Sequence, residues 1–109
     1  MPDSSLFPPA RAAMEAALAA ADPEPAVRRW LQEHPDTGRP FGRLVVMAVG
    51  KAAAGMARGA MAERSAQDCW VVTKVGHGAY GPAGCRLRET SHPVPDESSL
   101  AAGAELRAV

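Results

Sequence analysis

The amino-acid sequence predicts an α/β fold in which helices pack on a parallel β-sheet, and three segments carry this prediction. Residues 44–49 are a continuous apolar run of strand-forming residues, typical of a strand buried on both faces of a parallel sheet. Residues 52–62 are rich in alanine at helical spacing, and Gly55 and Gly59 would let this helix lie close to the sheet. Residues 69–75 are a second strand-forming run. Strand, helix and strand in this order predict a βαβ unit, the connection that joins parallel strands.

Two helices are predicted ahead of the first strand. The first covers residues 8–21, where two prolines suit a helix start and an alanine-rich run suits the interior. The second begins at Pro23, because Asp22 can accept a hydrogen bond from an exposed N–H and proline at the first helical position loses none. It ends before Pro35, and residues 36–42 form a turn-rich loop. One face of the second helix carries Val27, Trp30 and Leu31.

The remainder of the chain continues the α/β pattern. A glycine-rich loop at residues 76–84 precedes a short third strand at 85–89, and a proline-rich loop at 90–97 leads into a last helix at 98–109. No helix-ending glycine follows that helix, and so few strands leave an open, apolar sheet edge. We therefore expect residues 1–109 to be the N-terminal part of a larger α/β domain.

Composition and charge exclude several classes of function and location. The chain is 47% hydrophobic and 22% charged, so it can bury a core and is not a disordered tail. Twelve basic and twelve acidic residues give a formal net charge of zero, so no long-range field favours nucleic acid or an anionic membrane. No segment has the roughly 20 apolar residues of a membrane span, and the first residues lack the basic start of a signal peptide. We expect a cytoplasmic protein in which Cys69 and Cys85 stay reduced, because their spacing fits neither a CxxC motif nor a metal site.

The first candidate site is Gly50-Lys51-Ala52, directly after the first predicted strand. In open α/β sheets, ligands bind beyond the carboxyl ends of the strands, where a helix N-terminus offers N–H groups and a partial positive charge. Gly50 permits close approach of the backbone to an anion, and Lys51 adds a full charge suited to a phosphate or a carboxylate. The GxxxxGK[ST] spacing of a Walker A loop is absent. The alternative is a solvated lysine at a helix start, where the helix dipole disfavours a cation.

The second candidate site is the GxGxxG pattern of residues 76–81, which follows a predicted strand. Asp96 lies about twenty residues further on, as a dinucleotide-binding fingerprint requires. That fingerprint must also open a helix, whereas Pro82 leads here into an extended segment. The sequence therefore favours a loop whose glycines make turns, or a mobile loop at the rim of a cleft in which His77 is a polar contact.

The third candidate site is the proline-rich loop that contains His92 and Asp96. Either side chain could transfer a proton or contact a ligand, and Pro93 and Pro95 would hold the loop stiff. The alternative favoured for Asp96 is that it caps the last helix. No HExxH motif, Ser-His-Asp order or cluster of metal ligands accompanies these residues, so none is expected to bind a metal.

The three candidate sites together resemble the N-terminal domain of the class II glycerate kinases, also called glycerate 2-kinases. The resemblance rests on motifs in a fixed order and covers essentially the whole chain. Members of this family carry a C-terminal MOFRL domain, and many have been labelled hydroxypyruvate reductases. The motifs are Val49-Gly50-Lys51-Ala52-Ala53, then Val71-Val72-Thr73-Lys74 with Gly76-His77-Gly78, and then Ser91-His92-Pro93-Val94-Pro95-Asp96-Glu97.

The resemblance implies a Rossmann-like three-layer domain with a parallel sheet, of which residues 1–109 are the N-terminal part, and it implies that the MOFRL domain is absent. It implies phosphorylation of D-glycerate to 2-phosphoglycerate with ATP and Mg²⁺, in a cleft between two domains. The resemblance is also compatible with a homodimer of the full-length protein. The family's later glycine- and serine-rich loop is missing, so we expect the chain to be inactive alone. Matching the motifs places the catalytic lysine on Lys51, and substrate or phosphate binding on Gly50, Ala52, His77, Gly78, His92 and Asp96.

Two other functions stay open from the sequence. An NAD(P)H-dependent hydroxypyruvate reductase would use the GxGxxG-like loop, which is the local feature in its favour. A truncated, non-catalytic α/β module would account for the last helix, which no capping residue ends.

Overall fold

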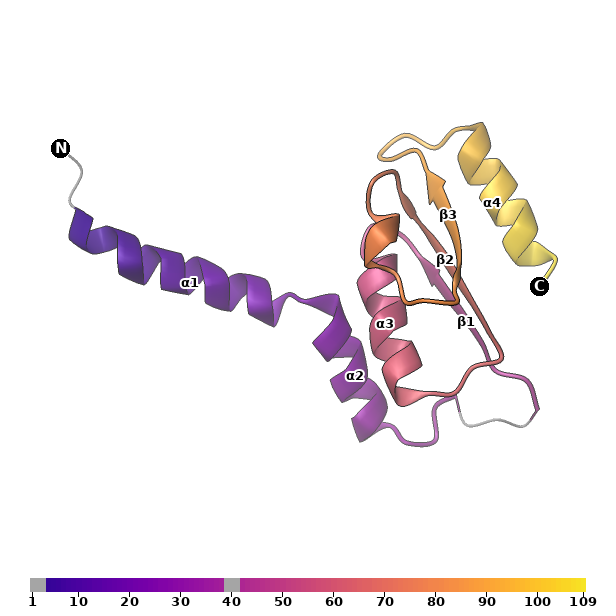
Figure 1. Ribbon diagram of the computed structural model, residues 1–109, viewed down its shortest axis with the longest axis horizontal. Helices are drawn as coiled ribbons and strands as arrows, with labels where there is room; N and C mark the ends of the chain where they lie inside the picture. Colours follow the sequence, from indigo (N-terminus) through magenta and orange to yellow (C-terminus); the bar gives the residue numbers. More distant parts are fainter. Residues whose placement is uncertain (1–3, 39–41) are drawn as a thin grey trace.

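A computed structural model describes residues 4–38 and 42–109, and its helices lie on both sides of a three-stranded sheet (Figure 1). The predicted order of helices and strands is confirmed. Residues 1–3, and residues 39–41 of the predicted turn-rich loop, lie outside the described residues. The elements are the short 3₁₀ helix η1 (Ser4–Leu6), α1 (Phe7–Ala20), α2 (Pro23–Glu33), β1 (Val45–Val49), α3 (Ala53–Glu63), β2 (Asp68–Lys74), the short 3₁₀ helix η2 (Gly78–Tyr80), β3 (Arg86–Thr90) and α4 (Glu97–Arg107).

The sheet is parallel and has the strand order β1-β2-β3. Val45 of β1 lies opposite Asp68 of β2, and Trp70 of β2 lies opposite Arg86 of β3. Residues 69–73 of β2 are buried, as expected of a central strand covered on both faces. The predicted α/β class is therefore confirmed, and the carboxyl ends of the three parallel strands lie at one edge of the sheet.

Helices α2 and α3 lie on one side of the sheet (Figure 1). Three alanines of α3, Ala53, Ala54 and Ala57, form a buried core with Cys69 and Val71 of β2. Short side chains of this kind allow a helix to pack closely against the strands of a sheet.

Gly55 and Gly59 of α3 face α2, which corrects the expectation that these glycines lie against the sheet. A Cβ on Gly55 would lie 2.8 Å from Cγ of Pro23, and a Cβ on Gly59 would lie 2.6 Å from the carbonyl oxygen of Glu24. The core alanines occupy the helix face toward the strands, and the glycines occupy a neighbouring face. The two helices therefore contact each other backbone to backbone.

Helix α4 lies on the opposite side of the sheet, next to β3, so the fold has three layers (Figure 1). On this side the ring of Trp70 is covered by Arg86 and Arg88, whose guanidinium carbons lie 5.0 and 5.9 Å from the ring centroid. Met47 and Val49 of β1 remain 46% and 63% exposed. The prediction that the first strand is buried on both faces is therefore wrong for this chain, because β1 is an edge strand that α3 covers on one face.

Helix α1 projects away from the sheet (Figure 1), and none of its residues is buried. Its large apolar side chains, Phe7, Met14 and Leu18, are all exposed. Within residues 4–38 and 42–109, no helix combines the length and the apolar character that crossing a membrane requires.

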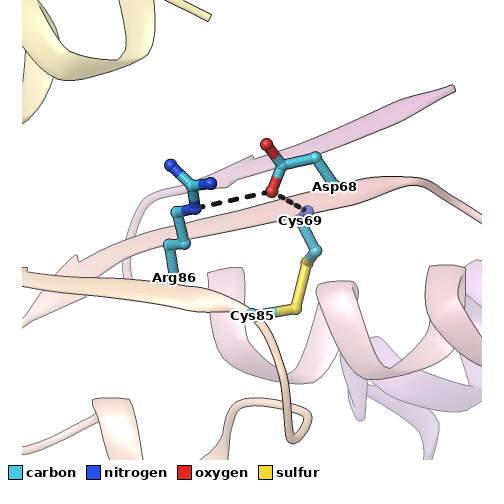
Figure 2. Close-up of a disulfide and its surroundings, with 4 residues drawn as sticks. All are labelled: Asp68, Cys69, Cys85 and Arg86. Atoms are coloured by element: carbon cyan, nitrogen blue, oxygen red, sulfur yellow. Dashed lines mark hydrogen bonds and ion pairs between the residues drawn. A yellow bond between two sulfur atoms is a disulfide. The ribbon is translucent and has the colours of Figure 1, made fainter. Parts of the chain in front are cut away.

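Cys69 and Cys85 are joined by a disulfide, which corrects the expectation of two reduced cysteines (Figure 2). Their Cα atoms are 4.7 Å apart although sixteen positions separate them in the sequence. The register of β2 and β3 explains this proximity, because Trp70 lies opposite Arg86 and the residue before each of them is a cysteine. The spacing of two cysteines in a sequence does not give this register, so the pairing could not be predicted.

Candidate functional site

The turn between β1 and α3 holds the first candidate site. Gly50 has φ of 119°, a conformation that residues with a Cβ rarely adopt. Its N–H donates to the carbonyl oxygen of Val72 at 2.9 Å, and its own carbonyl accepts from the N–H of Ala53 at 3.1 Å. The glycine therefore turns the chain sharply from the strand into the helix while both its backbone groups stay bonded.

Lys51 and Ala52 follow at the start of α3, and both are exposed. Ala52 is the N-cap residue and offers no side-chain cap. The hydroxyl of Thr73 donates to the carbonyl oxygen of Lys51 at 3.4 Å, which ties this turn to the end of β2. The N-terminus of α3 thus presents its partial positive charge and the ammonium group of Lys51 on the same side of the sheet edge.

A cavity of about 320 Å³ lies beside this turn. It is bounded by the start of α2, the first turns of α3 and the short helix η2. The lining residues are Asp22, Pro23, Glu24, Lys51, Ala52, Ala54, Gly55, Arg58, His77 and Tyr80.

The carboxylates at the cavity are already engaged. Nε of Arg58 donates to Oε2 of Glu24 at 3.0 Å, and Oδ1 of Asp22 accepts from the N–H of Glu24 at 3.1 Å as the N-cap of α2. The predicted capping by Asp22 is confirmed. Over the described part of the chain, no ion pair engages Lys51, although Asp22 and Glu24 line the same cavity.

His77 is the predicted residue of the second candidate site that reaches the cavity. It is half-buried and precedes η2, and its backbone N–H donates to the carbonyl oxygen of Lys74 at 3.1 Å. Its ring meets the ring of Tyr80 edge to face, with centroids 6.4 Å apart. His77, which follows β2, and Lys51, which follows β1, therefore line the same cavity.

Gly78 does not line this cavity, because it packs against β3. Its N–H donates to Oε1 of Glu89 at 3.0 Å, and a Cβ here would run into the side chain of Leu87. The GxGxxG pattern forms only the single turn η2 and then an extended segment, so the helix that a dinucleotide fingerprint must open is missing, as the sequence predicted.

His92 and Asp96 lie in the loop between β3 and α4, and neither lines the cavity with Lys51. Asp96 is the N-cap of α4, where its carboxylate accepts from the N–H of Ser98 at 2.9 Å and its own N–H donates to the hydroxyl of Ser99 at 3.3 Å. The hydrogen bond from the Ser98 side chain is the main reason that the pKa of Asp96 is lowered. The favoured capping role of Asp96 is therefore confirmed.

Arg58 and Tyr80 also line the cavity, although no motif in the sequence singled them out. Arg58 lies seven positions after Lys51, about two helical turns along the same side of α3. That spacing is a signal that could have found it. Tyr80 had no such signal, because its position depends on how the loop from β2 to β3 folds back beside α3.

Comparison with known proteins identifies relatives along almost the whole chain. The family described as "Domain of unknown function (DUF4147)" matches residues 9–109. A protein of Agrobacterium vitis named "Putative hydroxypyruvate reductase" is 44% identical over 99 residues, which cover 88% of this chain and 21% of that protein. The crystal structure of glycerate kinase from Thermotoga maritima matches with a TM-score of 0.76 and 29% identity, over 95% of this chain and 24% of that chain.

The chain spans a quarter or less of the length of these two relatives. The family match covers well over half of the chain, and the fold agrees with a related glycerate kinase. The chain therefore belongs to the DUF4147 family, in the glycerate kinase group that its three sequence motifs indicated.

Proposed function

We propose that this chain contributes to the active site of a glycerate 2-kinase, which transfers the γ-phosphoryl group of ATP to the 2-hydroxyl of D-glycerate. The observation that carries the proposal is the placement of Lys51 after β1, at the N-terminus of α3 and beside a cavity of about 320 Å³. The structural relative named as a glycerate kinase supports it. Such a chain would be inactive alone, because it spans 24% of the length of that relative.

Lys51 is proposed as the catalytic residue because phosphoryl transfer depends on positioning and charge neutralisation. In the reaction, the 2-hydroxyl oxygen of glycerate forms a bond to the γ-phosphorus, the bond from that phosphorus to the bridging oxygen of ADP breaks, and the hydroxyl proton is released. Negative charge builds on the transferring group and the leaving oxygen. The ammonium group of Lys51 and the N-terminus of α3 would stabilise that charge, or would hold the glycerate carboxylate.

The other predicted binding residues divide into three groups under this proposal. Gly50 and Ala52 would let an anion approach the backbone at the start of α3, and His77 would contact it from η2. Gly78 would act indirectly, since its N–H is bonded to Glu89 and it supports the position of His77. His92 and Asp96 would contact substrate only from the next strand end, at the same edge of the sheet.

The described residues fit an anionic group better than they fit a metal ion. No group of three or more histidine, cysteine or acidic side chains that could hold a metal occurs within residues 4–38 and 42–109. The carboxylates at the cavity are engaged by Arg58 and by the backbone of α2. Under this proposal, the Mg²⁺ ligands and most of the ATP pocket come from the rest of a longer protein, which would include the MOFRL domain.

The proposal also covers partners and location. The partners are D-glycerate and a nucleotide, with no nucleic acid and no membrane, because the chain has a formal net charge of zero. The longer protein would act in the cytoplasm and is compatible with a homodimer.

A hydroxypyruvate reductase is the second candidate function, because the Agrobacterium vitis relative carries that name. The fold of residues 76–81 weighs against it, since the pattern opens no helix for a dinucleotide pyrophosphate. A non-catalytic module remains the third candidate and would bind neither D-glycerate nor ATP.

The deciding experiment is ADP release from Mg-ATP and D-glycerate by a longer protein that contains this chain, beside the 109-residue chain alone. Activity in the longer protein alone, lost in Lys51→Ala, is the expected result. Oxidation of NADH by hydroxypyruvate, without ADP release, would replace the kinase by the reductase. Absence of both activities and of ligand binding in the longer protein would favour the non-catalytic module.

A further inference from the structure

We propose that Cys69 and Cys85 are a reversible thiol–disulfide site that controls the order of the crossover between β2 and β3, residues 75–85. Cys69 lies near the start of β2, and Cys85 ends the crossover immediately before β3 (Figure 2). Their Cα atoms are 4.7 Å apart, a separation that a disulfide spans without backbone movement. Because the strand register sets this distance, the two sulfur atoms stay neighbours whether or not they are bonded.

The crossover is otherwise lightly attached. Parallel strands are usually joined by a connection of a dozen or more residues that contains an α-helix, whereas this one forms the single turn η2. Val75 and Tyr80 are 64% and 65% exposed, so its larger apolar side chains add little to a core. Among the described residues, the crossover is bonded to β3 by the N–H of Val75, which donates to the carbonyl oxygen of Thr90 at its start, and by the hydrogen bond from Gly78 to Glu89 in its middle. The disulfide is the covalent link at its end.

The crossover also carries His77 and Tyr80, which line the cavity beside Lys51. Opening the disulfide removes the covalent link at the end of the segment that carries both rings, while β2, α3 and Lys51 keep their own hydrogen bonds and core. The consequence for catalysis rests on the proposed function, but the redox step and the ordering of the crossover do not. The oxidation state of the two cysteines would thus decide whether His77 and Tyr80 are held at the cavity beside Lys51.

The proposed chemistry is thiol–disulfide exchange with a small dithiol. Cys69 is 3% exposed and Cys85 is partly exposed, so Cys85 is the more exposed residue of the pair, and we take its sulfur as the one attacked. A thiolate of the dithiol attacks Sγ of Cys85, the S–S bond breaks, and the thiolate of Cys69 leaves and takes up a proton. The second thiol of the dithiol then displaces the thiolate of Cys85, which is protonated in turn. Two electrons and two protons pass to the protein, and the dithiol becomes a disulfide.

A cytoplasmic location would make this disulfide reversible rather than permanent. In reducing compartments, disulfides are mostly transient or redox-sensing, and glutathione and thioredoxins return them to thiols. Under this proposal, the observed disulfide and a reduced pair are two states of one site.

The first test uses the unmodified 109-residue chain in buffers of reduced and oxidised glutathione, followed by thiol titration and amide hydrogen exchange. We expect both cysteines to be bonded to each other in the oxidised buffer and free after dithiothreitol. On reduction, exchange in residues 76–85 should rise on the order of tenfold or more, because a loop-closing link is lost, while exchange in α3 and β2 stays unchanged. Two free thiols, or a glutathione adduct, in the oxidised buffer would overturn the proposal.

Two further outcomes of the same experiment also contradict it. Equal exchange of residues 76–85 in both states would mean that the disulfide does not order the crossover. A collapse of protection throughout α3 and β2 would make it a structural disulfide rather than a local control.

A matched pair of variants separates the redox effect from a direct effect of dithiothreitol. Cys85→Ser, and the double variant Cys69→Ala with Cys85→Ser, should both show the fast exchange of the reduced chain and no response to reductant. A response of the double variant would contradict the assignment to this pair. Hydrogen exchange reports on the crossover whether or not the protein is a kinase. Loss of the proposed function would therefore not change this result, and a negative result here would not contradict the proposed function.

Discussion

The carboxylate of Glu89 on β3 accepts a hydrogen bond from the backbone N–H of Gly78 in η2, at 3.0 Å. A Cβ on Gly78 would lie 2.7 Å from that same carboxylate oxygen and against the side chain of Leu87. The short helix therefore rests on β3 at a place where a residue larger than glycine would force the side chains of Leu87 and Glu89 to shift. This contact positions the neighbouring His77 at the cavity beside Lys51.

The first prediction concerns this contact. We expect Gly78→Ala to lower the free energy of unfolding by about 1–3 kcal/mol, because the new methyl group must displace Leu87 and Glu89. Chemical denaturation of the variant and the parent chain measures the difference. Gly103→Ala is the matched control, since a Cβ there meets nothing within 4 Å in the middle of α4. It should stabilise the chain by roughly 0.5–1 kcal/mol through helix propensity, and equal effects of the two variants would contradict the packing argument.

The second prediction concerns the contact between α2 and α3. A Cβ on Gly59 would lie 2.6 Å from the carbonyl oxygen of Glu24, and a backbone atom of a helix cannot move aside cheaply. We expect Gly59→Ala to cost about 1–2 kcal/mol of the free energy of unfolding, despite the better helix propensity of alanine. Thermal or chemical denaturation measures this loss. A stabilised variant would show that the two helices separate more easily than the structure indicates.

These two glycines show what the sequence could and could not predict. The α/β class and the order of helices and strands followed from periodicity and from strand-forming runs, which are local properties of the chain. The direction that Gly59 faces, and the partner of Cys69, depend on contacts between distant segments. No local pattern encodes such contacts, so the sequence placed Gly59, like Gly55, against the sheet and predicted reduced thiols.

The candidate site divides in the same way. The position of Lys51 at the sheet edge could be predicted, because a residue directly after a parallel strand and before a helix lies at the carboxyl end of that strand. Arg58 and Tyr80 reach the same cavity from a later helical turn and from the folded-back crossover. The exposure of Met47 and Val49 was also missed, because an apolar run predicts burial without saying whether a neighbour covers both faces.

The third prediction concerns Lys51 in a longer protein that contains this chain. We expect Lys51→Ala to lower the rate of ADP formation on the order of 10²–10³-fold, the effect of removing one group that stabilises charge in a transition state. Lys51→Arg keeps the charge and should retain more activity than the alanine variant. Because the side chain is exposed, the free energy of unfolding should change by less than about 0.5 kcal/mol. Turnover equal to that of the parent protein would remove Lys51 from the catalytic role.

The fourth prediction concerns Asp96, whose pKa is lowered from its usual 3.8, mainly by the hydrogen bond from the Ser98 side chain. A carboxyl group with a lower pKa in the folded chain than in the unfolded chain binds its proton more weakly when folded. Its stabilising contribution is therefore complete above about pH 3.8 and is lost as pH falls through the folded-state value. NMR titration of the Asp96 carboxyl carbon should place its midpoint below that of an unfolded reference peptide.

Two substitutions of Asp96 separate the cap from the charge. Asp96→Asn keeps a side-chain oxygen for the N–H of Ser98 but cannot titrate, so it should retain the first turn of α4 and lose the acid dependence. Asp96→Ala removes the acceptor and should increase amide exchange at Ser98 and Ser99, which form the first turn of α4. If α4 stayed equally protected in the alanine variant, the carboxylate would not be acting as a cap, and a role toward a ligand would become the better account of this residue.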